Sequence, residues 1–139
     1  MKRVFLSFAD GDAQKVKRLI TLLYSPDYDL DFYDGSLDMD IDTEGANAVK
    51  RAIGEKIVKC SITVCLIGEN THKSKWVDSE LQKSRHKGNR IIAMALKGVK
   101  EAVLPGVIKE EYLTFCPWNP QKLRELILEE PPRLFTNSL

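Results

Sequence analysis

Glu80 is the ionisable residue whose sequence neighbours most suggest a chemical role. Trp76, Glu80 and Ser84 are spaced four residues apart in one amphipathic segment, so they share a face of the helix predicted there. Glu80 would stand one helical turn beyond a strongly apolar strand, close to the edge of a sheet where ligands bind. A solvated helix glutamate has the same spacing, so position alone does not separate the two interpretations.

The motifs of several other chemistries are missing. Neither GxxxxGK[ST] nor GxGxxG follows any predicted strand, which argues against a P-loop enzyme and a Rossmann dehydrogenase. No serine lies in GxSxG, and His72 and His86 lack further ligands for zinc. We interpret both histidines as surface residues and predict no metal site.

Five apolar segments rich in β-branched and aromatic residues are predicted to be strands, with amphipathic helices between them. The strands are expected at 4–8, 30–33, 62–67, 90–96 and 112–116, and the helices at 12–24, 45–59, 76–87 and 119–130. Asp12 and Asn119 are the predicted caps of two helices. The acidic stretch 34–44 is the longest loop, and 97–111 stays ambiguous because glycine and proline interrupt it.

This alternation predicts an α/β fold, flavodoxin-like, with three α/β/α layers and a mostly parallel five-stranded sheet of order 2-1-3-4-5. We expect one domain over 1–130 and a tail over 131–139. In this order, the second strand lies on one side of the first strand, and the third and later strands lie on the other side. A ligand crevice is therefore expected beyond the carboxyl ends of the first and third strands, lined by residues 8–12 and 68–71 and the start of the next helix.

Composition limits the partners. A net charge of +1, from 21 basic and 20 acidic residues, gives no overall field for nucleic acid or anionic lipid, so neither is expected as a partner. We interpret the cluster Lys83, Arg85, Lys87 and Arg90 as a solvated helix face. Three cysteines without CxxC spacing, and no apolar run long enough to span a membrane, predict a cytoplasmic protein with reduced, mostly buried thiols.

The segment 61–81, SITVCLIGENTHKSKWVDSEL, resembles the TIR superfamily, and most of all the TIR-like branch of bacterial Thoeris antiphage systems. The family's Ser-x-Trp-x-x-x-Glu-Leu pattern maps onto Ser74, Trp76, Glu80 and Leu81. The opening VFLSFADGD and the segment FYDGS are also similar, and the resemblance runs from about residue 3 to 97. Val77 stands where many TIR domains have cysteine, in keeping with the Thoeris-like branch.

The resemblance implies that NAD is a substrate and that Glu80 is the catalytic residue. Nicotinamide becomes neutral as it leaves its pyridinium form, so an ionised Glu80 need only stabilise the oxocarbenium-like ribosyl group and bind its hydroxyls. The expected substrate-binding residues are Phe8, Ala9, Asp10, Ser36, Gly68, Ser74 and Trp76. Core packing of Phe8 or Trp76 and helix capping by Asp10 or Asp12 remain open alternatives.

The expected product is ADP-ribose or a cyclic ADP-ribose isomer, read by a downstream effector in antiphage defence. Homo-oligomers formed through TIR–TIR contacts are the expected assembly. The alternative is a non-catalytic TIR adaptor that acts by homotypic assembly. A receiver-like phosphoacceptor needs an aspartate at the end of the third strand, which here ends Leu66-Ile67-Gly68.

Overall fold

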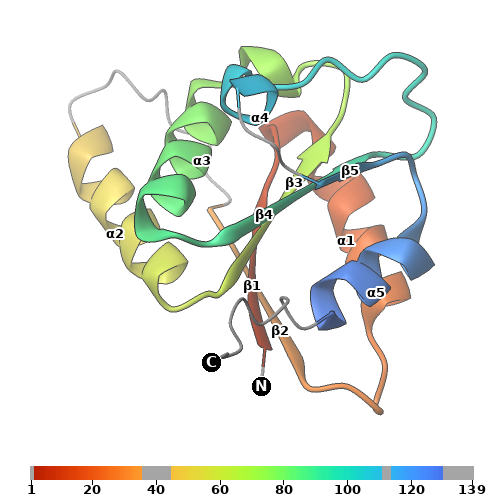
Figure 1. Cartoon of the computed structure of the whole chain (residues 1–139). Helices are drawn as coiled ribbons and strands as arrows, with labels where there is room; N and C mark the ends of the chain where they lie inside the picture. The colour runs from red at the N-terminus through yellow and green to blue at the C-terminus, as the bar shows by residue number, and fades with distance from the viewer. Residues whose placement is uncertain (1, 36–44, 111–113, 130–139) are drawn as a thin grey trace, which may run out of the picture.

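A computed structural model describes residues 2–35, 45–110 and 114–129, and contains a single five-stranded sheet within them (Figure 1). The strands are β1 (Lys2–Ser7), β2 (Leu30–Asp34), β3 (Ile62–Ile67), β4 (Arg90–Ala95) and β5 (Thr114–Cys116). All four pairings are parallel and the order is β2-β1-β3-β4-β5. The predicted flavodoxin-like topology is therefore confirmed.

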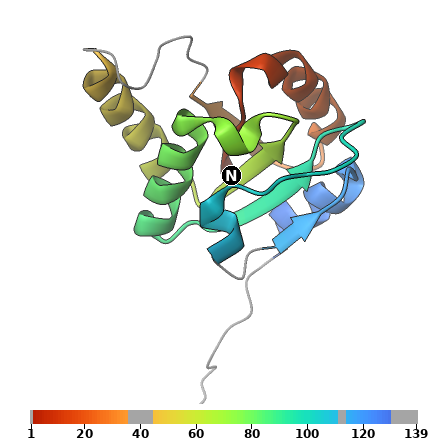
Figure 2. The same cartoon turned by 90° about the horizontal axis from the view of Figure 1, so that it is seen from above.

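Helices cover both faces of the sheet, as Figures 1 and 2 show. They are α1 (Ala13–Leu23), α2 (Ala46–Val58), α3 (Lys75–Lys87), α4 (Gly106–Glu110) and α5 (Pro120–Leu128), with short 3-10 turns η1 (Asp10–Asp12) and η2 (Thr71–Lys73). Side chains of α1 and α5 share one apolar cluster with the sheet, whereas α2, α3 and α4 contribute to clusters on the other face. This gives the three layers expected from the sequence.

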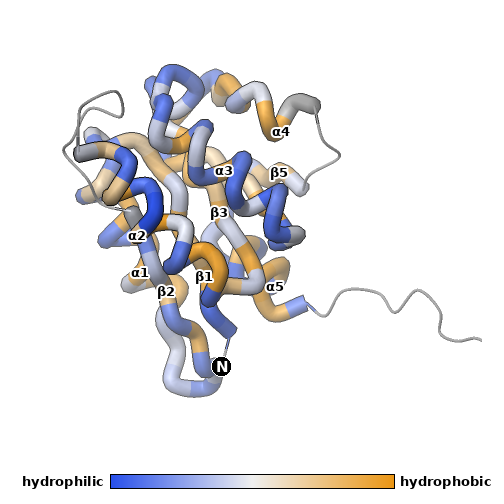
Figure 3. The backbone as a smooth tube through the Cα atoms, turned by 90° about the vertical axis from the view of Figure 1, so that its left-hand side faces the viewer, coloured by the Kyte–Doolittle hydropathy of each residue, from blue (hydrophilic) through white to orange (hydrophobic). Residues whose placement is uncertain are grey.

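The central strand is β3, whose six residues are all buried between β1 and β4. Along β1, Val4 and Leu6 belong to the cluster under α1 and α5, while Phe5 packs under α2. Ser7 follows the same alternation, so it points to the α2–α3 face. Figure 3 shows α3 as largely hydrophilic, although its inner residues Val77, Glu80, Leu81 and Ser84 are buried.

Some predicted boundaries and one predicted cap were wrong. Asp12 occupies the N-cap position of α1, but its side chain makes no capping hydrogen bond. Its carboxylate lies against the Cα of Gly68 instead, beyond the end of β3. The first strand starts at Lys2 and ends at Ser7, which leaves Phe8 outside it, and the ambiguous segment contains the short helix α4.

Some predictions fall on residues that the structure does not describe. They are most of the acidic loop, with Ser36, the first two residues of the predicted last strand, and the tail 131–139. The three cysteines, Cys60, Cys65 and Cys116, are described and are buried free thiols, as predicted. In the described ranges, no helix combines the length and apolar character needed to cross a membrane.

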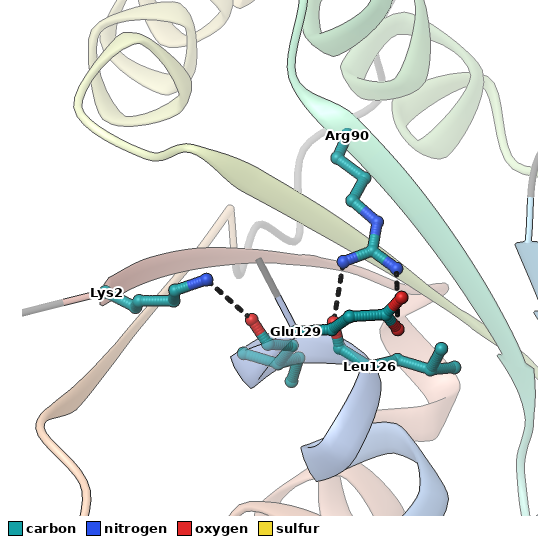
Figure 4. A network of polar contacts seen from close by, with 5 residues as sticks. Lys2, Arg90, Leu126 and Glu129 are labelled. Carbon is teal, nitrogen blue, oxygen red and sulfur yellow. Dashed lines mark hydrogen bonds and ion pairs between the residues drawn. The ribbon is translucent and has the colours of Figure 1, made fainter. Parts of the chain in front are cut away.

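Two cationic side chains hold the last turn of α5 against the amino-terminal ends of the strands (Figure 4). Lys2 Nζ donates to the carbonyl of Ile127 at 3.0 Å, and Arg90 donates to the carbonyl of Leu126 at 2.6 Å. Arg90 also lies 3.8 Å from the Glu129 carboxylate. Carbonyls at the end of a helix lack partners within it, so these bonds cap α5 and tie it to β1 and β4.

Candidate active site

Glu80 lies in the second turn of α3 and points at the sheet. Ser74 begins this helix as an N-cap, its hydroxyl accepting a hydrogen bond from Val77 N at 3.2 Å. Only 5% of Glu80 is exposed, and the Ser7 hydroxyl donates to its Oε1 at 2.6 Å. The bond joins α3 to the carboxyl end of β1, so the interpretation of Glu80 as a solvated helix residue is excluded.

Gly35, the residue after β2, is the second neighbour that shapes this position. A Cβ atom built on Gly35 would overlap Glu80 Oε2 and would also lie 3.4 Å from Ile53 Cδ1. The carboxylate therefore occupies the space that any side chain at position 35 would need. Glycine is required here for a close approach, and its backbone forms one wall around the carboxylate.

The surroundings of Glu80 favour its protonated form. Burial raises its pKa to about 7, and the Ser7 hydrogen bond, which stabilises the ionised form, offsets part of that rise. Two nearby carboxylates, Asp34 and then Asp10, raise the pKa further, whereas Lys83 lowers it. The catalytic hypothesis depends on the ionised form, which becomes more populated as pH rises through about 7.

Residues 9–12 follow β1 at the same edge of the sheet. Asp10, in η1, is exposed and near enough to Glu80 to raise its pKa. Ala9 is half-buried just before η1. Asp12 is partly buried against Gly68, and burial raises the pKa of its carboxyl while Lys15 lowers it. Among the expected binding residues, Asp10 is therefore one whose charge acts on the carboxyl of Glu80.

The remaining expected residues have structural contacts of their own. Trp76 packs with the cluster of Phe5, Ile53, Ile57 and Cys60 under α2, and Phe8 packs on the cluster of the opposite face. Ser74 caps α3, and Gly68 N donates to Thr71 Oγ1 at 2.7 Å. These contacts favour the core-packing alternative for both aromatic residues. Ser36 lies outside the described residues.

The sequence did not single out Ser7 or Gly35 as parts of the site. Both stand in segments used for the family resemblance, VFLSF and FYDGS, yet nothing local assigned them a role. Strand alternation would have placed Ser7 on the face opposite Leu6, but its partner is 73 positions away in the chain. Within the described residues, no cluster of three or more potential metal ligands is present.

A family model described as Thoeris protein ThsB, TIR-like domain, matches residues 5–101. The chain belongs to this family. The matched region runs from β1 to beyond β4, so it contains Ser7, Gly35 and Glu80 together. The resemblance predicted from the Ser-x-Trp-x-x-x-Glu-Leu segment is confirmed at the level of the ThsB TIR-like family.

A curated relative of this ThsB TIR-like domain comes from Bacillus cereus (strain MSX-D12). It is ThsB1, named provisionally as a cyclic ADP-D-ribose synthase, and is 36% identical over 69 residues, which are 50% of this chain and 36% of that protein. The matched part of the chain thus spans about a third of the length of the relative.

Two solved structures share the fold at low sequence identity. The TIR domain of the Toll-related receptor TRR-2 from Hydra magnipapillata superimposes with a TM-score of 0.59 and 18% identity, covering 89% of this chain and 90% of that one. The CMP N-glycosidase BcmB of Clostridium botulinum gives a TM-score of 0.57 and 16% identity, covering 91% and 98%. At these identities, the likeness establishes the fold alone.

Proposed function

We propose that this domain cleaves the bond between nicotinamide and ribose in NAD, with Glu80 as the catalytic carboxylate. The observation that carries the proposal is the position of Glu80, buried at the carboxyl end of β1 and hydrogen-bonded to Ser7. Parallel α/β sheets bind ligands at this edge, and a carboxylate with a strongly raised pKa there is typical of a reactive site. Membership of the ThsB TIR-like family supports NAD as the substrate.

The chemistry needs one well-placed anion. The C1′–N bond breaks with both electrons moving to the pyridinium nitrogen, so nicotinamide departs neutral and needs no proton. The ribose carbon is left with oxocarbenium character, which ionised Glu80 stabilises electrostatically in a water-poor setting. Ser7 positions the carboxylate by donating to Oε1, which leaves Oε2 beside Gly35.

The ribosyl cation is then captured by an oxygen or nitrogen nucleophile, which loses its proton if it carries one. Water gives ADP-ribose, whereas capture by the adenine or a ribose hydroxyl of the same molecule gives a cyclic ADP-ribose isomer. The provisional name of the Bacillus cereus relative favours cyclisation. We further propose that the product signals to a nucleotide-sensing effector in cytoplasmic antiphage defence, and that the domain works as a homo-oligomer.

Substrate contacts follow from the same edge of the sheet. We propose that Asp10 and the backbone at Ala9 and Gly68 lie along the dinucleotide, together with the start of α3 at Ser74. Phe8, Trp76 and Ser36 complete the proposed set. Both aromatic residues are half-buried and pack against core clusters, so we propose a smaller contribution from them than from the exposed Asp10.

The decisive experiment measures nicotinamide release from NAD by the purified protein and its Glu80→Gln variant. We expect release to fall roughly 100-fold or more, because the neutral amide keeps the shape but not the charge. Asp78→Asn is the matched control, since it makes the same change elsewhere on α3. Equal activity of Glu80→Gln and the wild type would refute the mechanism, and chromatography of the products separates cyclic from hydrolysed ADP-ribose.

The pH dependence is a second readout. Cleavage should rise with pH through about 7, where Glu80 ionises. Asp10→Asn should move this midpoint to lower pH, because it removes a negative neighbour. If no nicotinamide is released under any condition while the protein self-assembles, the adaptor function replaces the enzymatic one.

A further inference from the structure

A cavity of about 260 Å³ opens on the α1–α5 face of the sheet, whereas Glu80 lies under α3 on the opposite face. Its lining comes from three separate parts of the chain: Lys15, Arg18 and Leu22 of α1, Lys97 after β4, and Trp118 after β5. Figure 2 shows the segment after β4 reaching towards α1 and α5. The cavity shares no lining residue with the surroundings of Glu80.

Every ionisable side chain that lines this cavity is cationic. Lys15 and Arg18 are three residues apart on α1, a helix of sequence AQKVKRLITLL without any acidic residue, and Lys97 faces them from the sheet edge. All three side chains are exposed, and Asp12 is the described carboxylate whose field reaches Lys15. Among the described residues no carboxylate lines the cavity, and three cations around one cavity attract phosphate, which arginine and lysine bind through charge-assisted hydrogen bonds.

The rest of the lining is apolar. Leu22 is 55% exposed and contributes an apolar surface to the lining. Trp118 packs against the main core and also lines the cavity, so its indole forms a rigid aromatic wall. A planar heterocycle stacks well on such a surface. Phosphate-binding cations next to an aromatic wall match the two halves of a nucleotide.

The location and size of the cavity limit the kinds of ligand that it can bind. Lys97 and Trp118 follow β4 and β5, and Lys15 lies near the start of α1, so the cavity is at the carboxyl edge of a parallel sheet, where such folds bind ligands. Its volume is slightly below the roughly 300 Å³ at which drug-sized ligand sites begin. A base with its phosphates fits this space, with the sugar at the mouth, whereas a whole dinucleotide does not.

We infer that this cavity is a binding site for a nucleoside phosphate, separate from the site around Glu80. Arg18 and Lys97 bind the phosphates, Lys15 adds positive charge, and the base lies against Trp118 and Leu22. The inference does not depend on NAD cleavage, because it rests on residues of the other sheet face. A failure of nucleoside phosphate binding in the cavity would therefore leave the proposal of NAD cleavage at Glu80 standing, and the reverse also holds.

Calorimetric titration of the full chain with ADP tests the site. Arg18→Gln and Lys97→Gln should each weaken ADP binding about tenfold or more, since each loses a charge-assisted contact. Lys17→Gln is the matched control: it makes the same kind of change on α1 at an exposed residue outside the cavity lining, and should shift the affinity less than about twofold. Equal losses in Arg18→Gln and Lys17→Gln, or no ADP binding at all, would overturn the inference.

Two further probes examine the ligand chemistry. Adenosine and inorganic pyrophosphate should each bind at least about tenfold more weakly than ADP, because each lacks one half of the recognised structure. Tighter binding of the larger ADP-ribose than of ADP would contradict the size argument. In the Trp76→Phe variant, which leaves Trp118 as the remaining tryptophan, ADP should change the fluorescence, and an unchanged spectrum would count against stacking.

Discussion

At the scale of single residues, the notable feature is a buried carboxylate that forms no ion pair with any residue in the described parts of the chain. Glu80 accepts a hydrogen bond from Ser7, and its electrostatic neighbours are mainly negative. Burying a charge in this way costs stability unless the group binds a proton or a complementary ligand. The domain thus keeps a strained electrostatic environment at the place where a substrate with developing positive charge is proposed to bind.

Glu80 should make the stability of the domain depend on pH. Its pKa is 4.5 in the ordinary state and about 7 in the fold, so the protonated form is favoured on folding. The associated stabilisation is complete below the ordinary pKa and is lost as pH rises through about 7. We expect the unfolding free energy of the wild type, relative to Glu80→Gln, to fall by about 2–3 kcal/mol between pH 5 and pH 8.

Urea unfolding of the two proteins at both pH values measures this difference. The glutamine does not titrate, so its own pH dependence subtracts the contribution of every other group. Parallel pH profiles of the wild type and Glu80→Gln would show that the native environment does not perturb the carboxyl.

Gly35→Ala tests the close approach between β2 and α3. The new methyl group would overlap Glu80 Oε2, so the carboxylate must turn away, and we expect NAD cleavage to fall by roughly tenfold or more. Gly54→Ala is the control, because its Cβ meets Lys83 Cδ at an ordinary 3.9 Å and helix propensity favours alanine there. Full activity in Gly35→Ala would show that the position of the carboxylate is not critical.

At the scale of secondary structure elements, the starts of three helices are built in two different ways. Ser74 caps α3 through its side chain, and Asn119 caps α5 by accepting from Lys122 N at 3.0 Å. Asp12, at the corresponding position of α1, makes no such bond and packs on Gly68 instead. The helix that carries Glu80 thus has a fixed first turn, which helps to fix the direction of the glutamate.

Removing the cap of α3 should therefore be costly. We expect Ser74→Ala to lower the unfolding free energy by about 1 kcal/mol, the usual effect of losing a serine N-cap. Ser79→Ala, the same substitution in the interior of α3, should be neutral or slightly stabilising because alanine has the higher helix propensity. Thermal unfolding of the two variants gives the comparison, and equal melting temperatures would argue against the capping bond.

At the scale of the whole molecule, the two proposed sites lie on different faces of the sheet. The α2–α3 face holds Glu80 and Trp76, whereas the α1–α5 face holds the cationic cavity around Arg18. Lys2 and Arg90 hold α5 at the amino-terminal ends of β1 and β4 (Figure 4). Both proposed sites lie at the other, carboxyl-terminal edge of the sheet. Helix α5 thus completes the apolar cluster on this face, and Trp118 packs against that cluster.

The hydrogen bond from Arg90 to Leu126 O should contribute more to the stability of the domain than the ion pair between Arg90 and Glu129. We expect Arg90→Leu to lower the unfolding free energy by about 1–3 kcal/mol and to speed hydrogen exchange in α5, because a charged donor to a helix carbonyl is lost. Glu129→Gln should change stability by less than about 0.5 kcal/mol, since Glu129 is 57% exposed and 3.8 Å away. A larger effect of Glu129→Gln than of Arg90→Leu would reverse this ranking.

The sequence by itself determined the layered fold. Hydrophobic periodicity marks strands such as 62–67 and helices such as 76–87, because each must bury one face or both, and the α/β alternation then allows few topologies. The same local patterns predicted the caps at Asn119 and the proline-started α5 correctly. The motif from Ser74 to Leu81 was enough to indicate the family.

The tertiary structure alone decided what surrounds Glu80. Its hydrogen bond to Ser7, its contact with Gly35 and its pKa near 7 arise between segments far apart in the chain, and no local pattern encodes such distances. The failed cap at Asp12 has the same cause, because contact with Gly68 outweighed a bond within its own helix. The cavity around Arg18 and Trp118 likewise exists only once three separate segments have met. Periodicity specifies elements, whereas burial and charge at a site depend on how those elements pack.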